Sequence, residues 1–381
     1  MILIKNTILF FISVILFLII IEVILRFMPV NESFNFENVS KESLIFRSLP
    51  EKRKIQVSSK FDMRRAIKKS INSDGFVSPK EYQRSKEGKI LVSVIGDSYV
   101  EAAQVEDDET FFYKLQQDNP ELDIYSFGFS GAPLSQYLAW AQYSKNKYNN
   151  QYLIINIVSN DFDESLQKYK KSQGFYGYKQ ISNGKLELIK GNFVKVCDRD
   201  PSFLIKILYC KIGKNSSLFS YLVSNIGIQN FTKIIKAAWL NEDKDYVANV
   251  PAIVNYDREQ DSYLAINTFF EDLPNYSNLP SSRILFTVDG LRHEIYNSTD
   301  DSIESKNSYF SKMRQHFLTR AEYLGYNYID LHPLFKGHYQ EYGDKFEFSD
   351  DGHWNKLGHK VVSDAIKKSS FWKEVSKNSR H

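Results

Sequence analysis

Four short polar segments contain residue types that together could carry out acyl transfer. This chemistry needs a nucleophile, a base, an acceptor that orients the base, and hydrogen-bond donors for a developing oxyanion. Ser98 follows an apolar run that ends in a glycine turn, where a hydroxyl is exposed, and we predict it to be the nucleophile. His353 is the predicted base. Asp350, three residues earlier, is placed to accept a hydrogen bond from the far nitrogen of that imidazole.

Two further segments supply candidate oxyanion donors. Gly131 can offer a backbone N–H that no side chain blocks, and Asn160 can offer a side-chain amide. One such donor stabilises the transition state by about 2.7–4 kcal/mol. Each segment alone has an ordinary structural alternative, because glycines form turns and Asn-Asp pairs cap helices. Their order, each at a predicted strand end or in a terminal loop, favours a catalytic site.

The pattern around these segments predicts an α/β fold. Short β-branched apolar runs that end in polar loops are typical of buried strands, and here they alternate with helical stretches. We therefore expect a three-layer α/β/α sandwich with a mostly parallel five-stranded sheet, with ligands bound beyond the carboxyl ends of the strands. The predicted strands lie in 89–98, 122–131, 152–161, 282–290 and 326–331, and the predicted helices in 110–117, 134–147, 261–272, 308–324 and 355–368.

The N-terminal segment predicts a membrane anchor. Residues 8–21 carry no charge, and Glu22 is the only charged residue between Lys5 and Arg26. About twenty apolar residues cross a bilayer, and an i,i+4 pair of Glu22 with Arg26 would ease the cost of the acid. A cleaved signal peptide is the alternative, but the apolar run is long and no small-x-small site follows it.

The chain divides into three predicted parts. Residues 1–28 form the anchor, with the membrane contacted through residues 7–27, and residues 29–88 form a polar stem whose basic clusters we read as a solvated face. Residues 89–381 form the catalytic domain, which an insertion or cap at about 165–255 interrupts.

Composition excludes several classes of protein. The 381 residues hold 49 Lys+Arg and 46 Asp+Glu, a balance that argues against a nucleic-acid partner. Two cysteines cannot form a four-thiolate metal site, no His-Glu-x-x-His zinc motif exists, and no cofactor or metal is expected. Cys197 and Cys210 both lie in the insertion. A disulfide between them is favoured outside the cytoplasm, and buried free thiols are the alternative inside it.

The four segments resemble the blocks of the SGNH (GDSL-type) hydrolase family. The blocks here read VIGDSYVEAAQV with Ser98, YSFGFSGAPLSQY with Gly131, IVSND with Asn160, and SDDGHWNKLGHKVVSDAI with Asp350 and His353. The resemblance implies the α/β/α fold, the triad Ser98–His353–Asp350, and an oxyanion hole built from the Ser98 and Gly131 backbone N–H groups and Asn160.

Some positions depart from the family pattern or leave alternatives open. Val158 stands where the third block usually has a glycine, and Ser126 stands near the usual Asn of the second block. Gly128 is the alternative to Gly131 as oxyanion donor. Asp351 is the alternative to Asp350 as the orienting acid.

The resemblance covers about residues 72–371 without the insertion and implies a serine esterase or O-acyltransferase. With its N-terminal anchor, the chain is similar to enzymes that act on bacterial surface polysaccharides. This similarity implies an acyl ester or acylated glycan as substrate. The resemblance also implies a protein that crosses the bacterial cytoplasmic membrane once and has its catalytic domain in the periplasm. If the enzyme is a transferase, it would receive the acyl group from an acyl-donor partner in that membrane. The alternative class is a catalytically silent, membrane-tethered glycan-binding or assembly module. A third class, a dinucleotide-dependent oxidoreductase, is disfavoured because this sequence has no Gly-x-Gly-x-x-Gly motif after the first predicted strand.

Overall fold

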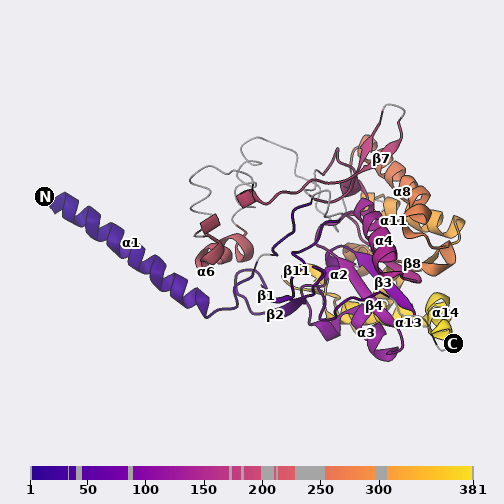
Figure 1. Ribbon diagram of the computed structural model, residues 1–381, viewed down its shortest axis with the longest axis horizontal. Helices are drawn as coiled ribbons and strands as arrows, with labels where there is room; N and C mark the ends of the chain where they lie inside the picture. Colours follow the sequence, from indigo (N-terminus) through magenta and orange to yellow (C-terminus); the bar gives the residue numbers. More distant parts are fainter. Residues whose placement is uncertain are drawn as a thin grey trace. The chain divides into compact units, whose positions relative to one another are not determined.

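A computed structural model shows how the chain folds (Figure 1). It describes residues 2–32, 34–39, 45–84, 89–170, 174–181, 184–198, 210–211, 213–227, 254–296 and 307–379. The chain forms two compact units. Unit 1 comprises residues 1–35, 54–69 and 194–244, and unit 2 comprises residues 36–53, 70–193 and 245–381. The segment predicted as a polar stem therefore contributes to both units.

Unit 2 is built on a five-stranded sheet with the order β4-β3-β5-β8-β9. All four pairings between neighbouring strands are parallel (Figure 1). Every residue of β3 and β5 is buried, as expected for strands covered on both faces. The parallel five-stranded sheet is confirmed. Its strands are β3 Leu91–Gly96, β4 Asp123–Gly128, β5 Tyr152–Ile157, β8 Ile284–Val288 and β9 Asn327–Asp330.

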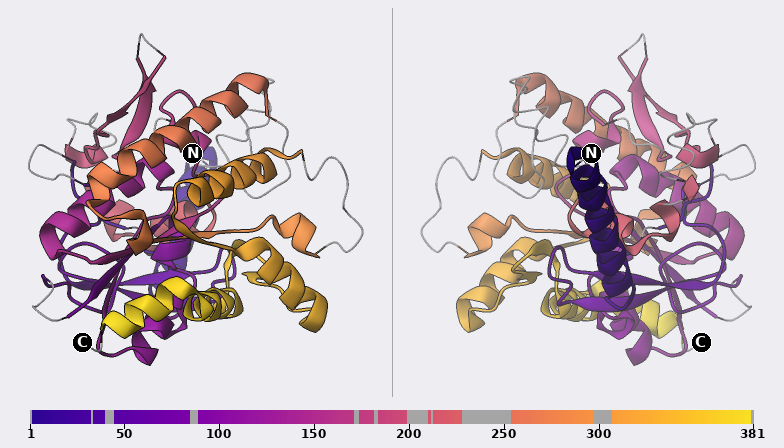
Figure 2. Two further views of the ribbon diagram at one scale, coloured as in Figure 1. Left: turned by 90° about the vertical axis from the view of Figure 1, so that its right-hand side faces the viewer. Right: turned by 90° about the vertical axis from the view of Figure 1, so that its left-hand side faces the viewer.

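Helices cover both faces of this sheet, which confirms the three layers (Figure 2). One layer contains α3 (Phe111–Asp118), α13 (Lys356–Lys368) and α14 (Ser370–Asn378), and the other contains α4 (Leu134–Tyr148), α8 (Tyr256–Ser277) and α11 (Tyr309–Tyr323). Successive residues of a strand point to opposite faces of the sheet, so they pack against different helix layers. Leu285 of β8 belongs to the core with α13 and α14, whereas the Phe286 ring contacts Phe270 at 5.6 Å and Phe317 at 5.0 Å.

Polar caps fix where the predicted helices begin. Thr110 accepts the Tyr113 N–H at α3, Ser308 accepts the Ser311 N–H at α11, and Asn355 accepts the Leu357 and Gly358 N–H groups at α13. Each cap satisfies backbone donors that a helix leaves unpaired at its start. The remaining elements of unit 2 are α2 Ser98–Glu101, β6 Gly177–Gln180, β7 Leu186–Ile189, α9 Arg292–Tyr296, α12 Leu331–Tyr342, β10 Glu347–Phe348, β11 Asp351–Trp354 and short 3-10 turns at 107–109, 163–165 and 281–283.

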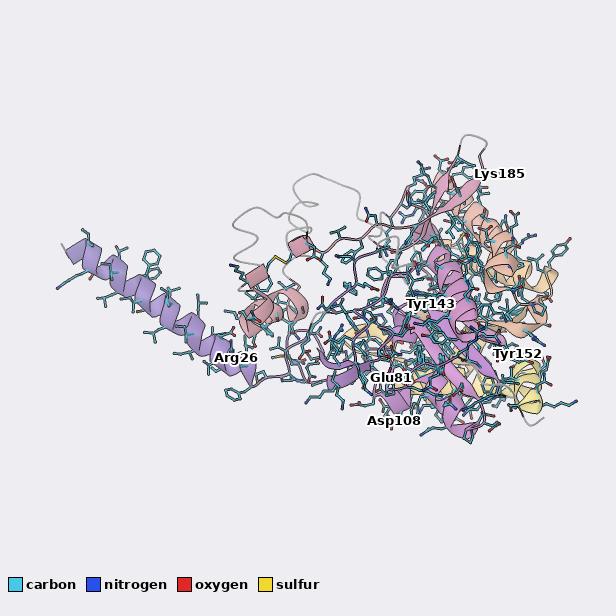
Figure 3. All side chains as sticks on the ribbon, in the orientation of Figure 1. Arg26, Glu81, Asp108, Tyr143, Tyr152 and Lys185 are labelled. Carbon is cyan, nitrogen blue, oxygen red and sulfur yellow. A yellow bond between two sulfur atoms is a disulfide. The ribbon has the colours of Figure 1, made fainter. Side chains whose placement is uncertain are left out.

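Unit 1 contains the N-terminal helix α1 (Ile2–Arg26). Within the described residues, the stretch Ile4–Arg26 is the one helix long and apolar enough to cross a membrane, and its side chains project outward along its length (Figure 3). The other elements of the unit are most of the paired strands β1 (Arg53–Ser58) and β2 (Ala66–Ile71), the helix α6 (Ser217–Ser220), a π-helical turn at Tyr221–Asn225 and 3-10 turns at 196–198 and 213–215.

Hydrogen bonds to one carboxylate join the insertion to α1. Glu22 of α1 accepts hydrogen bonds from the Ser216 hydroxyl at 2.8 Å and from the Ser217 and Leu218 N–H groups at 3.1 and 2.9 Å. It also pairs with Arg26 at 2.9 Å, as the i,i+4 spacing predicts. The disulfide expected between the two cysteines of the insertion is present in the structure (Figure 3).

Candidate active site

The strand order places the predicted site residues along one edge of the sheet. The order reverses at β3, which has β4 on one side and β5 on the other, and ligands bind at such a switch point beyond the carboxyl ends of the strands. Ser98 follows β3, Gly131 follows β4 and Asn160 follows β5. The three residues therefore extend from adjacent strand ends.

Ser98 begins the short helix α2 directly after β3 and is 7% exposed. Its Oγ lies 2.8 Å from Nε2 of His353 and 3.2 Å from a carboxylate oxygen of Asp97. The other Asp97 oxygen accepts the Tyr99 N–H at 3.0 Å and so caps α2. The Ser98 hydroxyl therefore sits at a fixed helix start, within hydrogen-bond reach of a base.

The carboxylate that is hydrogen-bonded to His353 is Asp351, whereas the sequence predicts Asp350 for this contact. Asp351 accepts a hydrogen bond from Nδ1 of His353 and also accepts the His353 backbone N–H, at 3.1 Å. The reason is local structure. The segment forms strand β11, which pairs with β10, and residues two apart in a strand point to the same side. Asp350 is exposed and lies outside this strand.

Two hydrogen bonds hold β11 against the sheet edge. The Tyr99 hydroxyl donates to the Gly352 carbonyl at 3.0 Å, which ties β11 to the helix that carries Ser98. The Trp354 indole donates to Asp289 at 3.3 Å, and Asp289 pairs with Arg292. Both anchors flank His353 in sequence, so they fix its imidazole next to Ser98.

The structure separates the two candidate glycines of the second block. A Cβ on Gly128 would lie 2.3 Å from the Glu101 nitrogen, so this glycine is required for the close packing of β4 against α2. Gly131 has a φ of +76°, in the left-handed region, and a Cβ there would meet only the Lys170 amine, at 3.5 Å. Gly131 lies in the open turn after β4, as a donor to a substrate must.

An ion pair links the two predicted oxyanion donors. Asn160 donates from Nδ2 to Glu164 at 3.1 Å, Glu164 pairs with Lys170, and Lys170 donates to the Gly131 carbonyl at 3.3 Å. This chain of contacts, the Asn160–Gly131 bridge, fixes one residue after β5 relative to another after β4. Sequence reasoning did not find Glu164 or Lys170, because neither belongs to a recognisable motif.

Glu101 holds the turn that contains Gly131 from the other side. It accepts the Ser130 N–H at 2.9 Å and the Ser130 hydroxyl, both with the same carboxylate oxygen. Its other oxygen is buried without a hydrogen-bond partner among the described residues. Burial raises the pKa of Glu101 to about 7. Sequence reasoning missed this residue too, because its contact with Ser130 depends on strand order.

Charge around His353 favours its protonated form. Burial alone would lower the pKa of His353, but the hydrogen bond and charge of Asp351, together with the charges of Asp97 and Glu101, outweigh it and raise the pKa above the ordinary value of 6.5. Burial also raises the pKa of Asp97, to about 6. An imidazolium formed next to Ser98 would therefore be stabilised.

No protein-family model matches the chain, and a search of curated proteins finds no match. Solved structures do resemble it at low identity. A two-domain esterase active on acetylated mannans has 10% identity and a TM-score of 0.38 over 76% of this chain, which spans 50% of that protein. An acetyl xylan esterase has 11% identity and a TM-score of 0.37, covering 75% of this chain and 100% of its own.

A G-D-S-L family lipolytic protein from Veillonella parvula has 8% identity and a TM-score of 0.36, covering 74% of this chain and 98% of its own. The chain is similar to these proteins at scores too low to carry an argument about its activity. Any function must therefore be argued from the contacts of Ser98, His353 and Asp351.

Proposed function

We propose that the chain is a serine-dependent ester hydrolase or acyltransferase of the SGNH type. The observation that carries this proposal is the continuous contact from Ser98 Oγ to His353 Nε2 at 2.8 Å and from His353 Nδ1 to Asp351. This is the arrangement of nucleophile, base and orienting acid that acyl transfer requires.

The proposed reaction has two halves. His353 removes the proton from Ser98 as Oγ attacks the ester carbonyl, and it then gives that proton to the leaving alcohol, which leaves an acyl-enzyme. In the second half, His353 activates water or an acceptor hydroxyl, which takes the acyl group and restores Ser98. Asp351 keeps the imidazole in the tautomer that presents Nε2 to the hydroxyl and stabilises the imidazolium.

The proposed oxyanion hole comprises the Ser98 and Gly131 backbone N–H groups and the Asn160 amide. Support comes from their positions after three adjacent strands and from the left-handed, uncrowded turn at Gly131. Asn160 uses its amide nitrogen to contact Glu164, and this nitrogen carries two hydrogens, so one remains for substrate.

The proposed substrate is an acylated glycan or lipid of the bacterial envelope. We propose that α1 crosses the cytoplasmic membrane once and that the catalytic domain lies on its periplasmic side. The length and apolar surface of α1 support the first point. The Cys197–Cys210 disulfide supports the second, because disulfides persist in oxidising compartments.

Product analysis of the full-length chain in detergent tests this proposal. With p-nitrophenyl acetate, the wild type should release p-nitrophenol and Ser98→Ala should not. An acetylated oligosaccharide as second product, formed only when an acceptor sugar is present, would identify a transferase. Free acetate in both cases would identify a hydrolase. Equal p-nitrophenol release by the two proteins, or none by the wild type, would contradict the mechanism and favour the non-enzymatic glycan-binding module.

A further inference from the structure

An exposed aromatic side chain projects from unit 1 in a strained conformation. The segment 59–65 connects β1 to β2, and we call it the Phe61 turn. Phe61 is 63% exposed and has a φ of +57°, which is unfavourable for a residue with a bulky side chain. The turn is nevertheless well tied, because Ser59 donates its N–H to Arg65 at 2.8 Å and its hydroxyl to Asp62 at 2.8 Å. Strain that is held in place in this way indicates a functional position.

The Phe61 turn lies against the last turns of α1. Met63 belongs to one small core with Leu25 and Val30, and Tyr221 packs against the same core. The Tyr221 hydroxyl also donates to the Phe61 carbonyl at 2.9 Å. These contacts place the turn beside the C-terminal end of the apolar helix.

This end of α1 is where a spanning helix meets the bilayer surface. The apolar stretch Ile4–Arg26 contains 23 residues, which extend about 35 Å at 1.5 Å per residue, against a hydrocarbon core of about 30 Å. A span by this stretch puts Leu25 and the turn packed on it at the bilayer boundary. Phe27 and Met28, which follow the helix, are 87% and 44% exposed. Exposed apolar side chains therefore occur both at the end of α1 and on the turn that packs against that end.

Exposed basic residues lie close to Phe61 in the sequence. Residues 54–69 contain six Lys or Arg residues and one acid, Asp62. Lys60 is exposed and the Arg64 side chain is 87% exposed, with Arg64 in contact with Asp62 at 3.2 Å. The sequence predicts a solvated face for these basic residues, but the packing of the Phe61 turn against α1 makes contact of Lys60 and Arg64 with lipid phosphates the better interpretation. Juxtamembrane basic residues bind anionic headgroups, and aromatic rings favour the interface.

We propose that the Phe61 turn is a second membrane contact, which inserts the Phe61 ring into the interface of the bilayer that α1 spans and sets Lys60 and Arg64 against phosphate headgroups. This inference rests on the proposed membrane span by α1. The turn would hold unit 1 at a fixed height and orientation on the bilayer, which a single helix followed by a loose stem could not do.

Spin-label accessibility in the full-length chain tests the proposal. The protein is placed in phosphatidylcholine nanodiscs with and without phosphatidylglycerol, and a nitroxide is attached at Lys60→Cys, which leaves Phe61 in place. The ratio of oxygen to nickel-chelate accessibility should be severalfold higher there than at Tyr323→Cys, an exposed aromatic position in α11 of unit 2. Phosphatidylglycerol should raise the ratio further, and adding Phe61→Ser should lower it to the value at Tyr323.

A third label, at Ile12→Cys in the middle of α1, shows whether a negative result concerns the Phe61 turn alone or the membrane span by α1. If Ile12 is deep in the bilayer and the Lys60 label is as accessible to the nickel chelate as Tyr323, the Phe61 turn does not touch the membrane and the inference is wrong. If Ile12 is itself accessible to the chelate, α1 does not span and the proposed membrane placement fails with it. Ester hydrolysis by Ser98 is measured separately and depends on neither result.

Discussion

Two carboxylates in different units show how the same side chain serves structure in one place and chemistry in another. Glu22, at the end of α1, accepts hydrogen bonds from the Ser216 hydroxyl, two backbone N–H groups and Arg26. Glu101, in the helix that follows β3 in unit 2, is buried; one of its carboxylate oxygens accepts hydrogen bonds from Ser130, and the other has no hydrogen-bond partner among the described residues.

The two carboxylates differ in how many hydrogen bonds their oxygens accept. A partly buried carboxylate whose two oxygens both accept hydrogen bonds stabilises the segments that it joins, and Glu22 joins the insertion to α1 in this way. Glu101 instead leaves one carboxylate oxygen without a hydrogen-bond partner among the described residues. Its charge, together with those of Asp351 and Asp97, raises the pKa of His353. We therefore expect substitutions near Glu101 to change the reaction and substitutions of Glu22 to change local stability.

The largest effect is expected at a third carboxylate, Asp351. Asp351→Asn replaces the carboxylate that holds the protonated Nδ1 of His353 with an amide that can donate to Nδ1 and favour the wrong tautomer, and kcat should fall by up to about ten-thousand-fold, as in other Ser-His-Asp sites. The pKa of His353 should also fall, so the remaining activity should extend to lower pH. The matched control is Asp350→Asn, which should change kcat less than about twofold because that side chain is exposed. The reverse ranking, measured with p-nitrophenyl acetate, would restore Asp350 as the orienting acid.

Glu101→Gln should lower kcat/KM about fivefold at pH 8, because a hydrogen bond to a charged group is about 1 kcal/mol stronger than one to a neutral amide. The wild-type activity should be lost as the pH falls through an apparent pKa above 6.5, since His353 must be neutral to act as base. Removing the charge of Glu101 should move that acidic limb to lower pH. Ser130→Ala removes one hydrogen bond but keeps the carboxylate, so it should move the limb less than Glu101→Gln does; equal shifts in both variants would contradict an electrostatic role.

The Asn160–Gly131 bridge offers a further test within the catalytic edge. Lys170→Met should lower kcat by up to about tenfold with KM little changed, because the bridge positions donors that act mainly in the transition state. Lys170→Arg, which can keep the ion pair with Glu164, should recover most of kcat. A rise in KM with kcat unchanged would instead assign Lys170 to substrate binding.

The smallest effect on catalysis is expected from Glu22→Ala. This change removes the acceptor for the Ser217 and Leu218 N–H groups, so hydrogen exchange at these amides should become faster, while ester hydrolysis should change less than about twofold. Glu32→Ala, an exposed acid in the same unit, is the control and should alter neither measurement. A large loss of activity in Glu22→Ala would remove the contrast between the two units.

Local sequence signals predict part of this structure well. β3 and β5 were predictable because each is a continuous buried run of mainly apolar residues, and the start of α13 because Asn355 caps it. The error at Asp350 arose because Asp-x-x-His spacing does not reveal that residues 351–354 pair with residues 347–348 as a strand. Glu101 and Lys170 were missed because their partners lie 29 and 39 residues away in the chain.

The central claim, that Ser98 is the nucleophile, is tested most directly by covalent labelling. The full-length protein is treated with a fluorophosphonate probe and the modified residue is identified by mass spectrometry, with and without Ser98→Ala. The account predicts one adduct, on Ser98, which is absent from the variant and much slower to form in Asp351→Asn. Labelling of Ser98→Ala equal to wild type, or no adduct on the wild-type protein, would contradict it.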